Sequence, residues 1–395
     1  MAPPSNIAAD KYPQRFASYD LLTRMTDGGM AELFVAIEDM GDAGRRLVTV
    51  KRIRPEHVHD PDFIDFFLTE SRITLKFAHP NLPAVYQHGC VDGLHYLAME
   101  YIHGHTVLEL IRASIRTAQP ISVDAVLTIA IGVAAALEHA HDLCDVDGEP
   151  LDVIHRDVTP QNIMLATSGA VKLIDFGIVR STIQVHRTRT GVVKGKLAYM
   201  APEQLEGAPT LDLRADLFSL GVVMWESLIG RPLFRGKSEL ETVDRIRRMR
   251  VPDPRQLRPD LPADVAAVVL KALERDPDRR FGTATELLIA LEETSAHCGV
   301  VLSKHRLRAE VTRFCGIPEI PVAPGVVAPQ AHDRAASAAD TDRVSIDSVL
   351  AEVASQRKSG LWSDPLLVYF LRQTGARVPG DPSGSGSASA NGPNP

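Results

Sequence analysis

The octapeptide HRDVTPQN occupies residues 155–162 and places an aspartate, Asp157, five residues before an asparagine, Asn162. On an extended loop, such a pair can hold a carboxylate near an attacking hydroxyl and an amide oxygen on a magnesium ion. The tripeptide DFG follows at residues 175–177, directly after a strand-like run. Its carboxylate, Asp175, could bind Mg²⁺, a hard cation that prefers oxygen ligands. The two segments therefore predict a site that transfers a phosphoryl group.

The composition of the 395-residue chain indicates a globular protein, because 45% of its residues are hydrophobic. A net charge of −7 argues against nucleic-acid binding. The four cysteines form no CxxC pair, so they predict neither a disulfide framework nor a zinc ribbon, and a cytoplasmic location is expected. No signal peptide is recognised, and the apolar run 125–137 is too short to span a bilayer. A buried helix and no membrane anchor are expected.

Hydrophobic periodicity divides the chain into a strand-rich part and a longer helical part. Apolar residues at helical spacing between residues 63 and 77 interrupt the strand-rich part. The β-prone runs lie at residues 33–37, 47–53 and 94–99. The later helical patterns lie at residues 123–141, 215–228, 263–274 and 283–293. This order predicts an α+β fold with two lobes.

Composition also predicts how the chain is organised. A leader is expected at residues 1–18, followed by one folded domain over residues 19–298. An added helix is expected within residues 299–318, because apolar residues there recur at helical spacing. Residues 319–378 are predicted to be a linker with a short helical tail, and residues 379–395, rich in Gly, Ser and Pro, to be disordered.

The tripeptide APE at residues 201–203 completes an ordered set with HRD…N and DFG. In this order and at this spacing, the motifs resemble those of the protein kinase superfamily over about residues 19–298. The resemblance implies a two-lobed protein kinase fold, with a small β-rich N-lobe at residues 19–101 and a helical C-lobe at residues 102–298.

A narrower resemblance rests on three short segments: GGMA at residues 28–31, the loop HRDVTPQN, and the pair Gly195-Lys196. These are similar to segments of eukaryotic-type (Hanks-type) serine/threonine kinases from bacteria with large kinase sets, such as myxobacteria. Pro160 fits the loop of Ser/Thr kinases, whereas tyrosine-type loops differ there.

The resemblance assigns roles to individual residues. Lys51, which ends the segment VTVK, is expected to grip the α- and β-phosphates of ATP and to pair with Glu70. Asp157 is expected to be the catalytic carboxylate, with Asn162 and Asp175 as ligands of Mg²⁺, or of Mn²⁺ in its place. The implied ATP-binding set is Met25, Thr26, Gly28, Gly29, Ala31, Leu33, Lys51, Glu100 and Ile102, with Met99 as gatekeeper. The implied structural set is Arg156, Glu203, Asp216 and Arg280.

Two departures from the family pattern affect the site. The phosphate-covering loop usually has three glycines, but Thr26 and Ala31 stand at the first and third places. The catalytic loop has Thr159 where a lysine is usual, and Lys196 stands where the family has a threonine. We hypothesise that Lys196 supplies the missing ammonium group, contacting Asp157 or the γ-phosphate, with Thr159 as its hydrogen-bonding partner. The alternative is that Lys196 points to solvent or binds acidic substrates.

The resemblance implies an ATP-dependent kinase that phosphorylates Ser or Thr hydroxyls of protein substrates. The loop between Asp175 and Glu203 is basic, with no acidic residue between these ends, so a phosphate could bridge its cations to Arg156. Autophosphorylation is expected at Thr188 or Thr190, with self-association for a reaction in trans. Two alternatives stay open: an ATP-binding pseudokinase or scaffold, and a small-molecule phosphotransferase.

Overall fold

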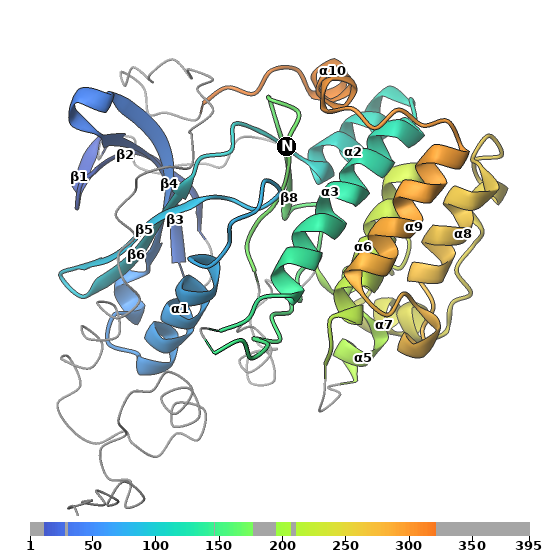
Figure 1. The fold of residues 1–395 in the computed structure, drawn as a ribbon, viewed down its shortest axis with the longest axis horizontal. Coiled ribbons are helices and arrows are strands. Elements are labelled where there is room, and N and C mark those ends of the chain that lie inside the picture. The colour runs from blue at the N-terminus through green and yellow to red at the C-terminus, as the bar shows by residue number, and fades with distance from the viewer. Residues whose placement is uncertain (1–11, 28–30, 146, 177–194, 207–210, 321–395) are drawn as a thin grey trace, which may run out of the picture. The chain divides into compact units, whose positions relative to one another are not determined.

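A six-stranded antiparallel sheet forms the first part of the chain (Figure 1). The computed structural model describes residues 12–27, 31–145, 147–176, 195–206 and 211–320. The strand order is β1-β2-β3-β4-β6-β5. The strands are β1 (Gln14–Phe16), β2 (Tyr19–Asp27), β3 (Ala31–Asp39), β4 (Arg45–Ile53), β5 (Val85–Val91) and β6 (Leu94–Glu100). The predicted β-prone runs lie inside β3, β4 and β6, where branched and aromatic residues favour pleated backbone.

Helix α1 (Pro61–Thr74) packs against this sheet. It begins where the Asp60 side chain accepts a hydrogen bond from the N–H of Asp62, with a proline at the first helical position. Phe63, Phe67 and Leu68 form its buried face. Phe63 and Phe67 lie four residues apart, the helical spacing that the sequence predicted here.

The second part of the chain is helical. Its helices are α2 (Val107–Thr117), α3 (Val123–His141), α5 (Pro202–Leu205), α6 (Arg214–Ile229), α7 (Glu239–Arg248), α8 (Ala263–Ala272), α9 (Ala284–His297) and α10 (Lys304–Cys315). A small sheet lies beside them, with the order β7 (Gly104–Thr106), β8 (Ile163–Ala166) and β9 (Val171–Leu173). Short 3₁₀ turns lie at Gly41–Ala43, Pro55–His57, Leu197–Tyr199, Pro254–Gln256 and Pro277–Arg279. The α+β prediction is confirmed.

Helices α3 and α6 form the centre of the helical core. Residues Ala215–Leu228 of α6 are all buried, and α3 packs against both α6 and α9. By length and composition, α3 could cross a membrane, but 56% of its most apolar window is buried inside the protein. The apolar run that predicted a buried helix therefore forms a core helix.

Helix α10 lies beside α2 and α3 (Figure 1). Its buried side chains are Leu307, Val311 and Phe314, and all three join the helical core. Glu310 accepts hydrogen bonds from the N–H of Ser122, at 2.7 Å, and from its hydroxyl. Ser122 in turn caps the start of α3. Polar and apolar contacts together therefore attach α10 to the helical part.

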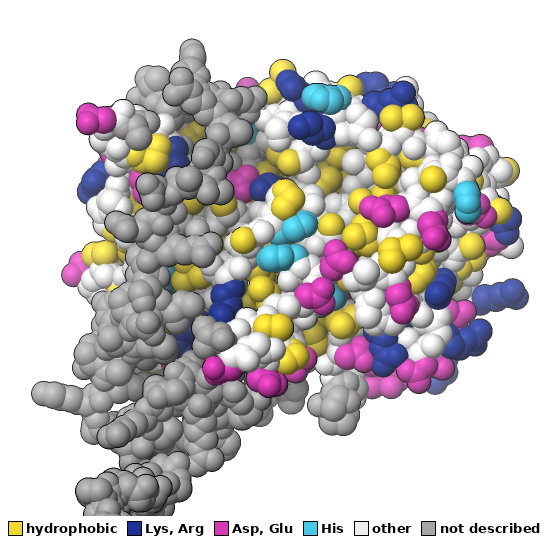
Figure 2. Space-filling model, viewed as in Figure 1, with side chains coloured by type: hydrophobic (Ala, Val, Ile, Leu, Met, Phe, Trp, Pro, Cys, Tyr) yellow, Lys and Arg dark blue, Asp and Glu magenta, His cyan; other side chains and the backbone are white. Residues whose placement is uncertain are grey.

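Contacts divide the chain into two units, residues 1–143 with 150–343, and residues 144–149 with 344–395. Every helix and strand named above belongs to the first unit. Several predictions fall on residues outside those that the structure describes: most of the leader, Gly28, Gly29, Thr188, Thr190 and everything after residue 320. On the face drawn in Figure 2, acidic and basic side chains are interspersed over the helical part.

Candidate active site

Lys51 and Glu70 form an ion pair between strand β4 and helix α1. Both side chains are largely buried, with 15% and 22% of their surfaces exposed. The buried face of α1 fixes the helix on the sheet, and Glu70 thereby points toward the strand. A partly buried ammonium held in this way can meet an anionic ligand without reorganising.

The carboxylate of Asp216 holds the backbone of the catalytic loop. It lies fully buried on α6 and accepts hydrogen bonds of 2.8 Å from the N–H groups of His155 and Arg156. His141 donates a third, from Nε2, at 3.1 Å. Burial alone would raise the pKa of Asp216, but the hydrogen bonds from His141 and His155 lower it overall.

These hydrogen bonds stabilise an unusual backbone conformation. Arg156 has a φ of +64°, in the left-handed region that non-glycine residues seldom adopt. Such a conformation costs about 1–2 kcal/mol for a residue with a Cβ atom. Asp216 offsets this cost by accepting from the two successive N–H groups that the turn presents.

Asp157 lies at the end of this turn and is 8% exposed. The side-chain amide of Asn162 donates to its backbone oxygen at 2.7 Å and to Oδ2 at 2.9 Å. Lys196 forms an ion pair with the same Oδ2. The structure therefore brings together Asp157, Asn162 and Lys196.

Hydrogen bonds through Ile174 connect this loop to Asp175. The N–H of Ile174 donates to the backbone oxygen of Asn162 at 2.8 Å, and His155 donates from Nε2 to the oxygen of Ile174 at 3.1 Å. Nδ1 of His155 accepts from the N–H of Asp157, so the ring is neutral. Burial lowers the pKa of His155, which agrees with that state.

Phe176 fixes the position of Asp175 by packing. Its ring lies 4.5 Å from that of Phe77 and 4.3 Å from that of His155, measured between ring centroids. Asp175 has a φ of +57°, so its backbone, like that of Arg156, adopts the left-handed conformation. Two residues of the candidate site therefore have strained backbones, a feature that clusters at functional sites.

Lys51, Glu70 and Asp175 line one cavity, together with Thr74, Phe77, Pro83, Val85, Leu97, Met99, Leu173 and Phe176. Within the described residues, no group of three or more His, Cys, Asp or Glu side chains could hold a metal alone. The oxygen ligands available for a metal ion are the carboxylate of Asp175 and the amide oxygen of Asn162. The amide nitrogen of Asn162 faces Asp157, so its amide oxygen points away from Asp157. A small number of protein oxygens is enough for Mg²⁺, because this ion is usually bound by one or two carboxylates together with substrate phosphates.

The hinge is defined here as residues 99–103, which extends the predicted adenine-binding segment, residues 99–101, by two residues. The N–H of Ile102 makes no hydrogen bond with the described residues. Glu100 uses its own N–H to bind the oxygen of Ala84 at 2.8 Å. Its side chain accepts from Lys172 at 2.7 Å. Leu33 and Ala31 lie on β3 and Met25 on β2, while the side chain of Thr26 lies outside the described atoms.

Thr159 differs from the expectation. Its side chain is 1% exposed, and its hydroxyl makes no hydrogen bond with any described residue. The expected hydrogen bond to Lys196 is therefore absent from this part of the chain. Lys196 reaches Oδ2 of Asp157 without a hydrogen bond from Thr159.

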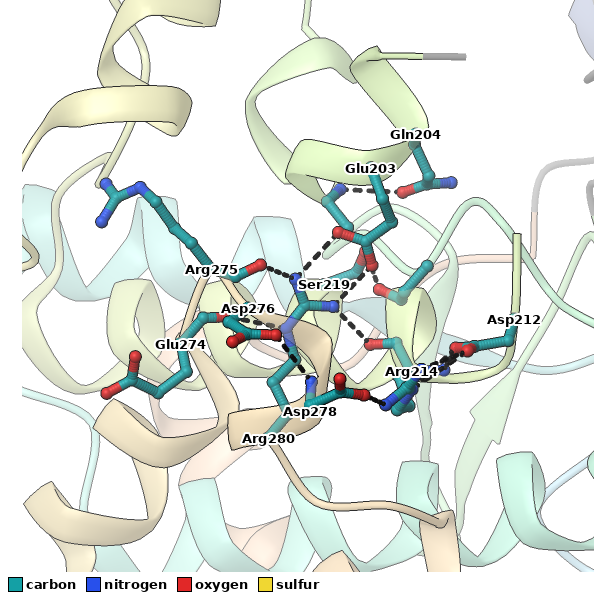
Figure 3. A network of polar contacts seen from close by, with 12 residues as sticks. Glu203, Gln204, Asp212, Arg214, Ser219, Glu274, Arg275, Asp276, Asp278 and Arg280 are labelled. Atoms are coloured by element: carbon teal, nitrogen blue, oxygen red, sulfur yellow. Dashed lines mark hydrogen bonds and ion pairs between the residues drawn. The ribbon is translucent and has the colours of Figure 1, made fainter. Parts of the chain in front are cut away.

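Glu203 and Arg280 form a buried, two-pronged ion pair (Figure 3). The distances are 2.6 Å from Nη1 to Oε1 and 2.8 Å from Nη2 to Oε2, and the Arg280 side chain is fully buried. Arg280 also donates to the backbone oxygens of Glu274, Arg214 and Arg275. The pair therefore attaches the segment before α6 to the turn that precedes α9.

Sequence reasoning missed several residues that support the site. Lys172 of β9 donates to the oxygen of Leu82 at 3.0 Å as well as to Glu100. Tyr199 donates to the buried Glu226 at 2.7 Å, and burial raises the pKa of Glu226. Their partners lie from 27 to 90 residues away along the chain. Spacing in the sequence carries no signal for such pairs.

Comparisons with known proteins agree with this geometry. Residues 19–290 match the family model described as a protein kinase domain. The chain is 38% identical over 279 residues to the tyrosine-protein kinase MasK of Myxococcus xanthus, covering 71% of this chain and 43% of that protein. It is 31% identical to the serine/threonine-protein kinase PrkC of Bacillus subtilis over 269 residues, covering 68% of this chain and 39% of PrkC.

Solved structures give the same picture. The kinase domain of Mycobacterium tuberculosis PknI superposes with a TM-score of 0.53 at 26% identity, covering 71% of this chain and 98% of that domain. The chain spans less than half the length of the curated relatives it matches, MasK and PrkC.

Glu203→Gln should lower the stability of the protein strongly, because it leaves the buried Arg280 without its counter-charge. Removing one partner of a buried ion pair typically lowers the free energy of unfolding by about 3–5 kcal/mol. The matched control is Asp278→Asn, which removes a carboxylate that is 83% exposed and pairs with Arg214 in the same network. Chemical denaturation of both variants measures the difference. Equal losses would contradict the importance given to the buried pair.

Proposed function

The chain belongs to the protein kinase domain family, and from this premise we propose that it transfers the γ-phosphate of ATP to Ser or Thr hydroxyls of proteins. The six-stranded sheet and the helical part are the two lobes of the protein kinase fold. We assign residues 19–101 to the N-lobe and residues 102–298 to the C-lobe, with α10 as an addition to the C-lobe.

One observation carries the proposal: the five residues expected to perform the chemistry form a connected set. Lys51, Glu70 and Asp175 line one cavity. Asn162 donates a hydrogen bond to Asp157. Its backbone oxygen accepts one from the N–H of Ile174, the residue before Asp175. A pseudokinase or scaffold has no need of this complete set. The presence of all five residues therefore favours an active enzyme.

Each residue has a physical role in this proposal. Lys51 binds the α- and β-phosphates and is aligned by Glu70. Asn162 and Asp175 would hold Mg²⁺, which when bound neutralises charge on the β- and γ-phosphates. Asp157 orients the attacking hydroxyl and accepts its proton. The hinge N–H of Ile102 would bind adenine.

The choice of Ser and Thr over Tyr rests on the relatives and on one loop residue. PrkC is named a serine/threonine kinase, and Pro160 fits that type of loop. MasK, at 38% identity, is named a tyrosine kinase. Phosphoamino-acid analysis of a labelled protein acceptor distinguishes these specificities directly.

Lys196 is proposed to supply the cation that the catalytic loop lacks. Its ammonium group lies against Oδ2 of Asp157, where the family's loop lysine would otherwise bring positive charge. The transition state needs that charge near the transferred phosphoryl group, whichever loop provides it. Thr159 is buried beside this site, and its hydroxyl makes no hydrogen bond with the described residues, so it does not hold Lys196 there.

Phosphorylation of the activation loop is proposed as the regulatory step, with Thr188 or Thr190 as acceptor. The loop carries Arg180, Arg187, Arg189, Lys194 and Lys196 without an acidic residue. A phosphate adds about −1.5 to −2 charges, which can bridge these cations to Arg156. A reaction in trans would require transient self-association.

Asp175→Asn and Lys51→Met should each lower phosphate transfer from radiolabelled ATP to a generic protein by at least about 10²- to 10³-fold. Both substitutions remove a preorganised charge at the phosphates while keeping side-chain size. Asp260→Asn, at a surface aspartate that is 69% exposed, is the charge-matched control and should retain full activity. Near-normal activity in either site variant, with the fold verified by circular dichroism, would contradict the site. No transfer by the unaltered chain would contradict the proposed function.

Lys196→Thr should lower kcat by about 10²-fold, and adding Thr159→Lys should recover much of that loss, because the exchange restores the family's arrangement. Single-turnover kinetics of both single variants and the double variant complete the cycle. A double variant no faster than Lys196→Thr would count against a catalytic cation. If Thr159→Lys unfolds the protein, Lys196→Arg against Lys196→Met decides, since only Arg keeps the charge.

Mass spectrometry of the active enzyme should find phosphate at Thr188 or Thr190, because the basic loop is stabilised by an added anion. The Asp175→Asn protein, purified in the same way, is the control and should lack the modification if the enzyme modifies itself. An unmodified loop in fully active enzyme would rule this regulation out.

A further inference from the structure

The chain continues from α10 in an extended segment, residues 316–320, here named the strap. Figure 1 shows it running from α10 toward the strands of the N-lobe sheet. Its side chains alternate in exposure: Ile317 and Glu319 are exposed, whereas Pro318 and Ile320 are half-buried. Alternation of this kind is the pattern of an extended segment with one face packed against a surface.

The strap is hydrogen-bonded to the hinge. His103 donates from Nε2 to the backbone oxygen of Pro318 at 2.7 Å, and His105 donates from Nε2 to that of Gly316 at 3.3 Å. His103 directly follows Ile102, whose backbone N–H is the candidate adenine contact. The strap therefore binds the chain one residue away from that contact.

The end of the strap packs on the N-lobe sheet. Ile320 contacts the buried cluster of Leu22, Val35 and Ile37, which also includes Leu47 and Tyr101 at its edge. Val35 and Ile37 lie two and four residues after Leu33 on β3, a strand paired with β4 without a bulge. Alternate residues of a strand face the same side of the sheet. Ile320 therefore covers the side on which the candidate nucleotide contact Leu33 lies.

The other end of the strap is fixed to the C-lobe through α10. Phe314 and Val311 are buried in the helical core, and Glu310 binds Ser122. The turn between β8 and β9 adds a close backbone contact: Gly169 has a φ of +88°, and a Cβ atom there would lie 2.1 Å from the oxygen of Lys304. The C-lobe end of the strap is therefore rigidly held.

We propose that the strap positions the nucleotide site, with Ile320 as the residue through which it acts. By joining α10 to the hinge and to the nucleotide-facing side of the sheet, it holds the two lobes at the separation that ATP requires. The proposal rests on the proposed function, because it concerns the binding of ATP. The match to the kinase family ends at residue 290, so the strap is an addition to the part of the chain that the family pattern covers.

The strap acts on binding and leaves the chemistry unchanged. Its contacts reach the hinge and the sheet, and neither Asp157 nor Asp175 is among its partners in the described part of the chain. Weakening the contact of Ile320 should therefore raise the KM and Kd for ATP while kcat stays within a factor of about two. A loss of stability alone would not separate KM from kcat in this way.

The test compares Ile320→Ala with Ile317→Ala in the full chain. Ile317 is 76% exposed on the same segment and is the matched control. Loss of about three buried methyl or methylene groups should raise the Kd for Mg²⁺-ATP by about fivefold or more in Ile320→Ala, measured by calorimetric titration. Ile317→Ala should bind as the unaltered chain does, and Ile320→Val should recover most of the affinity. Melting temperatures of the three variants verify that each is folded.

Three outcomes overturn the inference, and the first two separate its failure from the failure of the proposed function. If the unaltered chain binds ATP but Ile320→Ala binds it as tightly as Ile317→Ala does, the strap has no positioning role and the proposed function stands. If the unaltered chain binds no ATP, both proposals fall. A fall in kcat equal to the rise in KM would also contradict a role confined to nucleotide binding.

Discussion

The buried carboxylate of Asp216 is the interaction on which the rest of the site depends. It lies in the middle of the helical core and accepts from two successive backbone N–H groups of the catalytic loop and from His141. A carboxylate without such partners would be too costly to bury, and the turn at Arg156 would be too strained to persist. The hydrogen bonds from the turn offset the cost of burying the carboxylate, and the carboxylate offsets the strain of the turn. The position of Asp157 is thus set by the helix behind it, since the loop has no regular structure of its own.

Local signals explain how much of this arrangement the sequence could predict. The strands around Lys51 and Leu97 have short β-prone runs, and α1, α3, α6, α8 and α9 have the apolar spacing or continuous apolar character of core helices. The ordered motifs around Asp157 and Asp175 predicted the candidate site because the spacing between their residues can be read directly in the sequence. Boundaries differed by a few residues at several ends, where capping residues and not periodicity decide.

Long-range contacts explain what the sequence could not predict. Strands β1, β2 and β5 and helix α2 were not predicted, because their hydrophobic patterns are short or mixed with charge. The hydrogen bond from His141 to Asp216 and the ion pair from Lys172 to Glu100 join residues 75 and 72 positions apart. The packing of Ile320 against the cluster of Leu22, Val35 and Ile37 is also a contact between distant parts of the chain. Only the folded chain places these partners together.

The ion pair between Lys172 and Glu100 constrains a distance within the site. Lys172 lies three residues before Asp175 on the chain, and it binds both the hinge carboxylate and the oxygen of Leu82. The ion pair therefore joins the hinge to strand β9, which leads to Asp175. The distance between the hinge and the strand that leads to Asp175 is therefore constrained by a side-chain contact as well as by the backbone.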